Sequence, residues 1–97
     1  MRRRGKVDGN HTAVVKALRQ IGATVQSLAD IGKGCPDLLV GWRGRNVLLE
    51  VKDGSLPPSA RNLTPDEAKW SAAWQGSPVL VVLGPEEAIR AVVGSLP

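Results

Sequence analysis

The chain has 97 residues, of which 42% are hydrophobic, and it carries a formal net charge of +4 at pH 7. This length provides one domain with a single core and excludes two independently folded domains. No apolar run approaches the roughly 20 residues that cross a bilayer, and the lone cysteine, Cys35, excludes an internal disulfide and a zinc framework. The basic charge balance favours a polyanionic partner.

A basic arm is expected over residues 1–9, ahead of a single domain over residues 10–97. The cations of this arm are Arg2, Arg3, Arg4 and Lys6. Cations on an exposed arm can meet phosphates, although they can equally serve only to keep a segment solvated. No signal-peptide hydrophobic stretch follows them, so we expect an intracellular, cytoplasmic protein.

The first elements predicted along the chain are a helix and a short strand. Apolar residues at helical spacing predict a helix from Asn10, which is suited to cap it, to about Gln20. Gly22 would end that helix. Residues 24–29, TVQSLA, carry β-branched side chains that predict a strand, and the glycine-rich loop DIGKGCP follows.

Two apolar strands come next and predict a hairpin. They cover Asp37–Trp42 and Asn46–Lys52, joined by Arg-Gly-Arg. Residues 53–62 contain glycine and two adjacent prolines, which predicts a loop.

The C-terminal part of the chain predicts a helix, a buried strand and a last helix. Thr64, Pro65 and Glu67 have the pattern of a capping box with proline at the first helical position, so a helix should run from there to about Gln75. Residues 77–83 read as a buried strand and residues 85–93 as a helix. The order αβββαβα indicates an α/β fold with a mixed β-sheet and flanking helices.

The register of the hairpin decides which charged residues meet. A turn centred on Gly44 and Arg45 would place Asp37 opposite Lys52 and Leu39 opposite Glu50. Because side chains alternate, one face of the hairpin is then entirely apolar, and the other is charged at the end far from the turn. A three-residue turn would put Asp37 on the wrong face unless a bulge corrected it.

Asp37, Glu50 and Lys52 share the charged end of the predicted hairpin. The two acids are diagonal neighbours, roughly 7–8 Å apart at the backbone, so their carboxylates can converge on one ion. Paired oxygen ligands suit Mg²⁺ or Mn²⁺, and the backbone carbonyl of Val51 could add a further ligand. Lys52 could stabilise developing negative charge, or orient or deprotonate a water. The alternative is a cross-strand ion pair between Asp37 and Lys52, with Glu50 at a solvated strand end.

These residues resemble a known nuclease motif. Pro36-Asp37, followed after twelve residues by Glu50-Val51-Lys52, resembles the PD-(D/E)xK motif. The stretch GCPDLLVG at residues 34–41, with LEVK at 49–52, is similar to the VRR-NUC branch, and the length and layout resemble its short phage-type stand-alone members. The resemblance extends from about Asp8 to Val93 and implies a restriction-endonuclease-like core.

The resemblance also implies an activity. It implies a metal-dependent endonuclease that hydrolyses DNA phosphodiester bonds, with Asp37 and Glu50 as ligands of Mg²⁺ or Mn²⁺ and Lys52 as the catalytic lysine. The implied mechanism is in-line attack on phosphorus by a metal-activated water. Similar stand-alone proteins act as homodimers on branched DNA such as Holliday junctions, and phage-type members imply a phage-encoded protein acting in a bacterial host.

One position departs from the family pattern. Many relatives carry a glutamate on the first helix near the metal, where this sequence offers Asn10 and His11. An amide oxygen or a neutral imidazole can bind a divalent ion, so His11 is a candidate metal ligand. The alternatives are a helix cap for Asn10 and an exposed position for His11. Gln26 either points into the site or lies at a sheet edge.

The tryptophans suggest a role in assembly. Trp70 and Trp74 are four residues apart and share a helix face. We expect one of them to pack in the core against the apolar sheet face and the other to lie at the interface of a two-fold homodimer. Trp42 is expected in the core, although its place near the turn would also allow it to stack on a base.

Further cations are candidate DNA contacts, and two other functions stay open. Lys33 and Arg61 lie in the loops that flank the proposed site, and Arg43 and Arg45 lie in the predicted turn. Their alternative role is solubility. The chain could instead be a non-catalytic branched-DNA-binding module, because the helix glutamate is missing, or a protein-interaction domain that uses the tryptophan-bearing helix.

Overall fold

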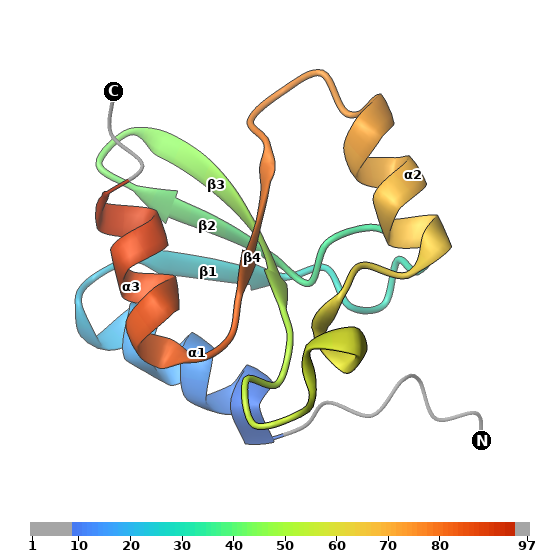
Figure 1. Cartoon of the computed structure of the whole chain (residues 1–97). Coiled ribbons are helices and arrows are strands. Elements are labelled where there is room, and N and C mark those ends of the chain that lie inside the picture. Colours follow the sequence, from blue (N-terminus) through green and yellow to red (C-terminus); the bar gives the residue numbers. More distant parts are fainter. Residues whose placement is uncertain (1–8, 95–97) are drawn as a thin grey trace.

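The computed structural model describes residues 9–94, which fold around a four-stranded sheet (Figure 1). The elements in chain order are α1 (Gly9–Gln20), β1 (Thr24–Ser27), β2 (Leu38–Trp42), β3 (Arg45–Val51), the 3₁₀ helix η1 (Pro58–Arg61), α2 (Pro65–Ala73), β4 (Val79–Val82) and α3 (Pro85–Val93). This order confirms the predicted α/β architecture, and η1 is one turn within the stretch expected as a loop.

The core lies between one face of the sheet and two helices. The strand order is β1-β2-β3-β4, with antiparallel pairing as far as β3 and parallel pairing between β3 and β4, so the sheet is mixed as predicted. Helices α1 and α3 lie side by side and pack on the same face (Figure 1). The fully buried side chains of this layer include Val14, Leu18, Leu38, Val40, Leu49, Val82 and Val92. The apolar hairpin face is therefore core, with Trp42 packed at its margin.

The hairpin turn is centred on Arg43 and Gly44, so the predicted register is wrong. Trp42 pairs with Arg45, and the two central residues have φ of 50° and 82°, as in a type I′ turn. The Arg43 guanidinium lies 5.0 Å from the Trp42 ring centroid, a cation–π contact that favours this conformation. Leu39 consequently faces Leu48 and not Glu50. Because the shift is two residues, each side chain keeps its predicted face.

The end of α1 and the start of α2 follow their sequence signals, and the start of α1 does not. Gly22, at φ 97°, donates its N–H to the Arg19 carbonyl at 3.0 Å and ends α1 as predicted. Thr64 and Glu67 form the predicted capping box of α2. Asn10 lies inside α1 and is not its cap, because its amide instead donates to two carbonyls at the ends of β3 and β4.

Helix α2 stands apart from the sheet (Figure 1). None of its residues is buried, and no other helix or strand of the described chain packs closely against it. Trp70 and Trp74 stack on each other with ring centroids 4.7 Å apart, and Trp74 is 50% exposed. The prediction that one of them fills the core is wrong, because α1 and α3 already cover the apolar sheet face.

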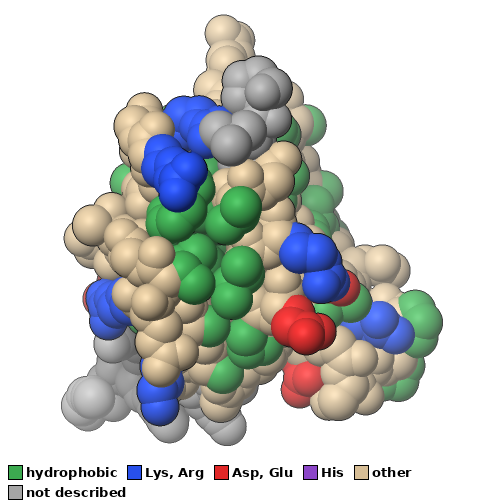
Figure 2. Space-filling view, turned by 90° about the vertical axis from the view of Figure 1, so that its left-hand side faces the viewer, with side chains coloured by type: hydrophobic (Ala, Val, Ile, Leu, Met, Phe, Trp, Pro, Cys, Tyr) green, Lys and Arg blue, Asp and Glu red, His purple; other side chains and the backbone are tan. Residues whose placement is uncertain are grey.

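The described surface carries no continuous basic patch on the face turned to the viewer in Figure 2. On that side, Lys and Arg side chains are scattered around a band of hydrophobic ones. Among the helices within residues 9–94, none combines the length and the apolar character needed to span a bilayer.

Candidate active site

Asp37 is held at the end of β3 by two backbone contacts. Its carboxylate Oδ2 accepts a hydrogen bond from the Val51 N–H at 2.7 Å. Its own carbonyl accepts from the Leu28 N–H at 2.8 Å. The β2–β3 ladder ends with Leu38 paired to Leu49, so the next step of the same register brings Asp37 beside Glu50. The structure thus brings together the two acids that the sequence singled out, by a different pairing from the predicted one.

Glu50 is a buried acid with a strongly raised pKa. Its residue is 4% exposed, and it is the buried charged residue of the described core. Burial, followed by the charge of Asp37 and by side-chain hydrogen bonds to Glu67 and Asp37, raises the pKa of Glu50 from 4.5 to about 9. At neutral pH Glu50 therefore holds a proton within a cluster of carboxyl groups. The alternative of a solvated strand end for Glu50 is wrong.

Lys52 is paired with an acid that the sequence did not nominate. Its Nζ lies 2.8 Å from Glu67 Oε1 and 3.8 Å from Glu50 Oε2, so the direct ion pair is with Glu67. Burial alone would lower the pKa of Lys52, but its hydrogen bond to Glu67 and the surrounding carboxylates raise it. Lys52 is therefore a cation at neutral pH, which suits it to stabilise negative charge rather than to remove a proton from water.

Glu67 joins the site to the first turn of α2. Its Oε1 accepts hydrogen bonds from Lys52 Nζ at 2.8 Å and from the Thr64 N–H at 2.9 Å, and its own N–H donates to Thr64 Oγ1 at 3.2 Å. Although burial alone would raise the pKa of Glu67, these hydrogen bonds lower it, so Glu67 is the ionised partner of Lys52. The sequence identified Glu67 as a helix cap, and no spacing signal connects it to a lysine 15 residues away.

Two further contacts fix the elements around the site. Gly34, at φ 85°, lies so close to α2 that a Cβ at this position would overlap the Asp66 carbonyl. On the other side, the Asn10 amide donates to the Lys52 carbonyl at 2.8 Å and to the Leu83 carbonyl at 3.2 Å. Asn10 is thus a structural clamp on the chain that follows Glu50, and its amide nitrogen faces carbonyl groups rather than a cation.

Two other candidates lie elsewhere. Gln26 is exposed on the edge strand β1, where its amide donates to the Ser27 carbonyl at 3.1 Å. His11 lines a groove between α1 and β1. Within residues 9–94, no three or more His, Cys, Asp or Glu side chains form a group that could hold a metal ion, so His11 is not brought to the Asp37–Glu50 pair as a third side-chain ligand.

The predicted DNA-binding cations fall into separate regions. Arg2, Arg3, Arg4 and Lys6 lie outside the described residues. Lys33 is exposed in the loop beside α2, and Arg61 is half-buried at the end of η1. Arg43 and Arg45 lie at the hairpin turn, the opposite end of β3 from Glu50, and the five residues of strand from Arg45 to Glu50 place Arg45 about 17 Å away.

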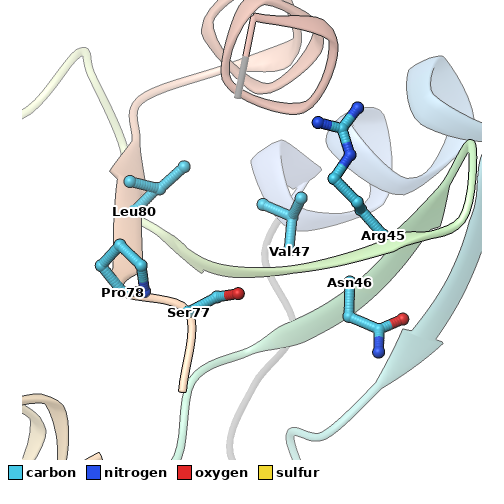
Figure 3. A pocket seen from close by; sticks show the side chains of 6 residues that line it. All are labelled: Arg45, Asn46, Val47, Ser77, Pro78 and Leu80. Atoms are coloured by element: carbon cyan, nitrogen blue, oxygen red, sulfur yellow. The ribbon is translucent and has the colours of Figure 1, made fainter. Parts of the chain in front are cut away.

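A cavity of about 400 Å³ lies at that distant end of the sheet. Figure 3 shows Arg45 and Val47 projecting to one side of β3 and Asn46 to the other, with Ser77, Pro78 and Leu80 completing the lining. None of the acids of the site contributes to it. This cavity is therefore separate from the candidate site.

The donor set at the end of β3 fits a hard divalent cation. Asp37 and Glu50 are close enough to share a side-chain hydrogen bond, and both present carboxylate oxygens. Glu50 is buried with a proton that a cation would replace, because a metal ligand must be ionised. Asp37, Glu50 and the Val51 carbonyl are the ligands that this end of β3 offers.

A solved structure shares this architecture. A protein described as "VRR_NUC domain" matches with a TM-score of 0.63 and 24% sequence identity, covering 88% of this chain and 91% of that chain. The chain has the fold of a VRR_NUC domain. The match confirms the fold that the resemblance found in the sequence implies. No protein-family model matches the sequence, and no curated protein matches it significantly.

The raised pKa of Glu50 makes the stability of this VRR_NUC-like domain depend on pH. A carboxyl group whose pKa is raised on folding stabilises most below its ordinary pKa of 4.5, and this contribution is lost as the pH rises toward 9. We expect Glu50→Gln, which mimics the protonated acid, to gain stability relative to wild type between pH 5 and 9, by up to about 1.4 kcal/mol per pH unit. Urea denaturation in EDTA at several pH values measures the difference in the free energy of unfolding between Glu50→Gln and the wild type. A difference independent of pH would contradict the expectation.

The ion pair with Glu67 should control the protonation of Lys52. We expect Glu67→Gln to lower the pKa of Lys52, because it removes the charge and weakens the hydrogen bond that raise it. NMR titration of the Lys52 side chain measures the shift. Thr64→Ala is the matched control, since it removes the other half of the capping box and keeps the carboxylate. An equal shift in both variants would show that helix capping, not charge, is responsible.

Proposed function

We propose that this chain is a metal-dependent endodeoxyribonuclease of the VRR-NUC type. The observation that carries the proposal is the meeting of Asp37, Glu50 and Lys52 at one end of β3, where Asp37 bonds to the Val51 N–H and Lys52 lies 3.8 Å from Glu50. The VRR_NUC fold supports a nuclease-type domain. A buried acid placed beside a second acid is costly to keep for stability alone, which favours a functional reason for it.

In this proposal Asp37, Glu50 and the Val51 carbonyl hold Mg²⁺ or Mn²⁺. Such an ion, when bound, lowers the pKa of its water and neutralises charge on a phosphate. The Val51 N–H engages one oxygen of Asp37 and so orients the other toward the ligand position. Glu50 gives up its proton on entry of the ion, so its burial ties metal affinity to pH.

Lys52 acts in this proposal as a fixed positive charge. Hydrolysis adds water oxygen to phosphorus, breaks one phosphorus–oxygen ester bond and concentrates negative charge on the phosphate oxygens in the transition state. A protonated Lys52 beside that phosphate stabilises this charge. Glu67 holds Lys52 at 2.8 Å and limits the positions that its ammonium group can take.

We infer branched DNA as the substrate class and a two-fold dimer as the working form. Symmetric cutting of a four-way junction needs two sites related by a two-fold axis. Helix α2 supplies an unpartnered surface for it, because none of its residues is buried and Trp74 is 50% exposed. Val81, on the same sheet face as Glu50, is 40% exposed and adds apolar surface.

The direct test is cleavage of labelled DNA. We expect the protein to nick a four-way junction in Mg²⁺ or Mn²⁺, to spare the matching linear duplex, and to be inactive in EDTA. Asp37→Asn, Glu50→Gln and Lys52→Ala should each lower the rate by at least about 100-fold, since each removes a ligand or the transition-state charge.

Binding measured on the same variants separates catalysis from recognition. Each should keep its affinity for the junction within a few-fold in EDTA. Tight binding without cuts in the wild type would favour the non-catalytic DNA-binding module, and cutting by Lys52→Ala would remove that residue from the mechanism.

The dimer is tested separately. We expect Trp74→Ala to shift the protein toward the monomer in light scattering coupled to size exclusion, because a central aromatic side chain often carries 2 kcal/mol or more of interface energy, roughly 30-fold in the dissociation constant. Ile31→Ala is the control, since Ile31 is 60% exposed and lies outside α2. A monomeric wild type at working concentrations would contradict this part of the proposal.

A further inference from the structure

A groove of about 610 Å³ runs between α1 and the edge strand β1. Val15 lies within it, and polar side chains line the rest of it. The polar lining consists of His11, Thr12, Lys16, Arg19 and Gln20 from α1 and Ser27 from β1. Thr12, Lys16, Arg19, Gln20 and Ser27 are exposed, so their polar ends are available to a ligand.

The groove carries two cations that can hold a polyanion. Lys16 and Arg19 are cations three residues apart, which places them on one helix face. Thr12, Gln20 and Ser27 add neutral hydrogen-bond donors. No Asp or Glu lines the groove in the described part of the chain, so nothing in its lining repels a phosphate. Arg19 donates one hydrogen bond to the Val25 carbonyl at 3.2 Å, which leaves its other N–H groups for a ligand.

One end of the groove lies near the end of the sheet that carries the candidate active site. At one end, His11 follows Asn10, whose amide bonds to the Lys52 carbonyl. On the other wall, Ser27 precedes Leu28, whose N–H bonds to the Asp37 carbonyl. Each wall of the groove therefore begins one residue away from a hydrogen bond to the backbone of Lys52 or Asp37. Helix α1 leads away from the candidate site.

The length of the groove suits a short run of nucleotides. At 1.5 Å per residue, the stretch from His11 to Gln20 is about 13 Å long. With 3.4 Å per base step along one strand, this corresponds to roughly four nucleotides.

We propose that the α1–β1 groove binds the sugar-phosphate backbone of the DNA strand that runs through the active site, with Lys16 and Arg19 each contacting a phosphate. This inference rests on the proposed function and adds a substrate track to it. Sequence analysis did not select these residues, because they read as the solvated face of an amphipathic helix. The contact reads the backbone and not the base edges, so it adds affinity without sequence preference.

The test measures DNA binding in EDTA, where no cleavage occurs. Fluorescence anisotropy with a labelled junction and a labelled duplex, over a series of salt concentrations, compares the wild type with Lys16→Ala/Arg19→Ala. The matched control is Arg90→Ala, compared with Arg19→Ala alone, because Arg90 is exposed and lies outside both the groove and α2. A charge-preserving pair, Lys16→Arg/Arg19→Lys, tests rescue.

We expect the groove variant to bind at least about tenfold more weakly near 0.1 M salt, with a salt slope about 1.8 lower for duplex, because two phosphate contacts are lost. The control and the charge-preserving pair should stay within about threefold of the wild type. Equal binding by the groove variant and the control would overturn the groove and leave the nuclease proposal standing. A wild type that binds no DNA at low salt would overturn both.

Discussion

Strand β3 is buried on both of its faces. One face is apolar, and the other carries a buried acid. Val47 and Leu49 point into the layer covered by α1 and α3, whereas Leu48 and Glu50 point to the other side and are also buried. Burial of an acid is stable only when neighbours supply a proton, a cation or hydrogen bonds. The position of Asp37, Lys52 and Glu67 around this strand end follows from that requirement, and so does the chemistry proposed for it.

The acids around the end of β3 differ in pKa. Glu50 is the deepest and keeps a proton, while Glu67 lies nearer the surface and stays ionised because Lys52 and the start of α2 donate to it. The environments of two carboxyl groups on neighbouring elements thus drive their pKa values in opposite directions, as is common where acids do chemical work. Lys52 lies between them, nearer to Glu67 than to Glu50, and this placement keeps it charged.

Local sequence signals predicted most of the fold but not its long-range contacts. Element order, the buried hairpin face and the Thr64 capping box were readable because each depends on residues close in sequence. The turn register was missed because Arg43 takes a left-handed conformation beside Trp42, which residue preference does not favour. The position of α2 was missed for a different reason: nothing along the chain reports that two other helices already fill the core.

The residues of the candidate site also divide into those that local sequence signals predict and those that depend on long-range contacts. Asp37, Glu50 and Lys52 could be selected because strand alternation alone places them on one face. A register shift of two residues, as found here, leaves each side chain on that face. Glu67 could not, because its contact with Lys52 spans a loop and depends on how closely Gly34 lets α2 approach. Asn10 was predicted to cap its own helix. Its amide instead donates hydrogen bonds to carbonyls that lie 42 and 73 residues further along the chain.

The first turn of α2 has a consequence for how this protein can vary. The Asp66 carbonyl lies against Gly34, and Glu67 holds Lys52, so substitutions at positions 34 and 67 act directly on the candidate site. The rest of the helix, with Trp70 and the following C-cap residue Trp74 stacked on each other, buries no residue in the core. One nine-residue helix therefore has an inner end fixed by the candidate site and an outer end that the core of the domain does not constrain. Selection can remodel the outer turns to change the partner while the contact between Glu67 and Lys52 stays intact.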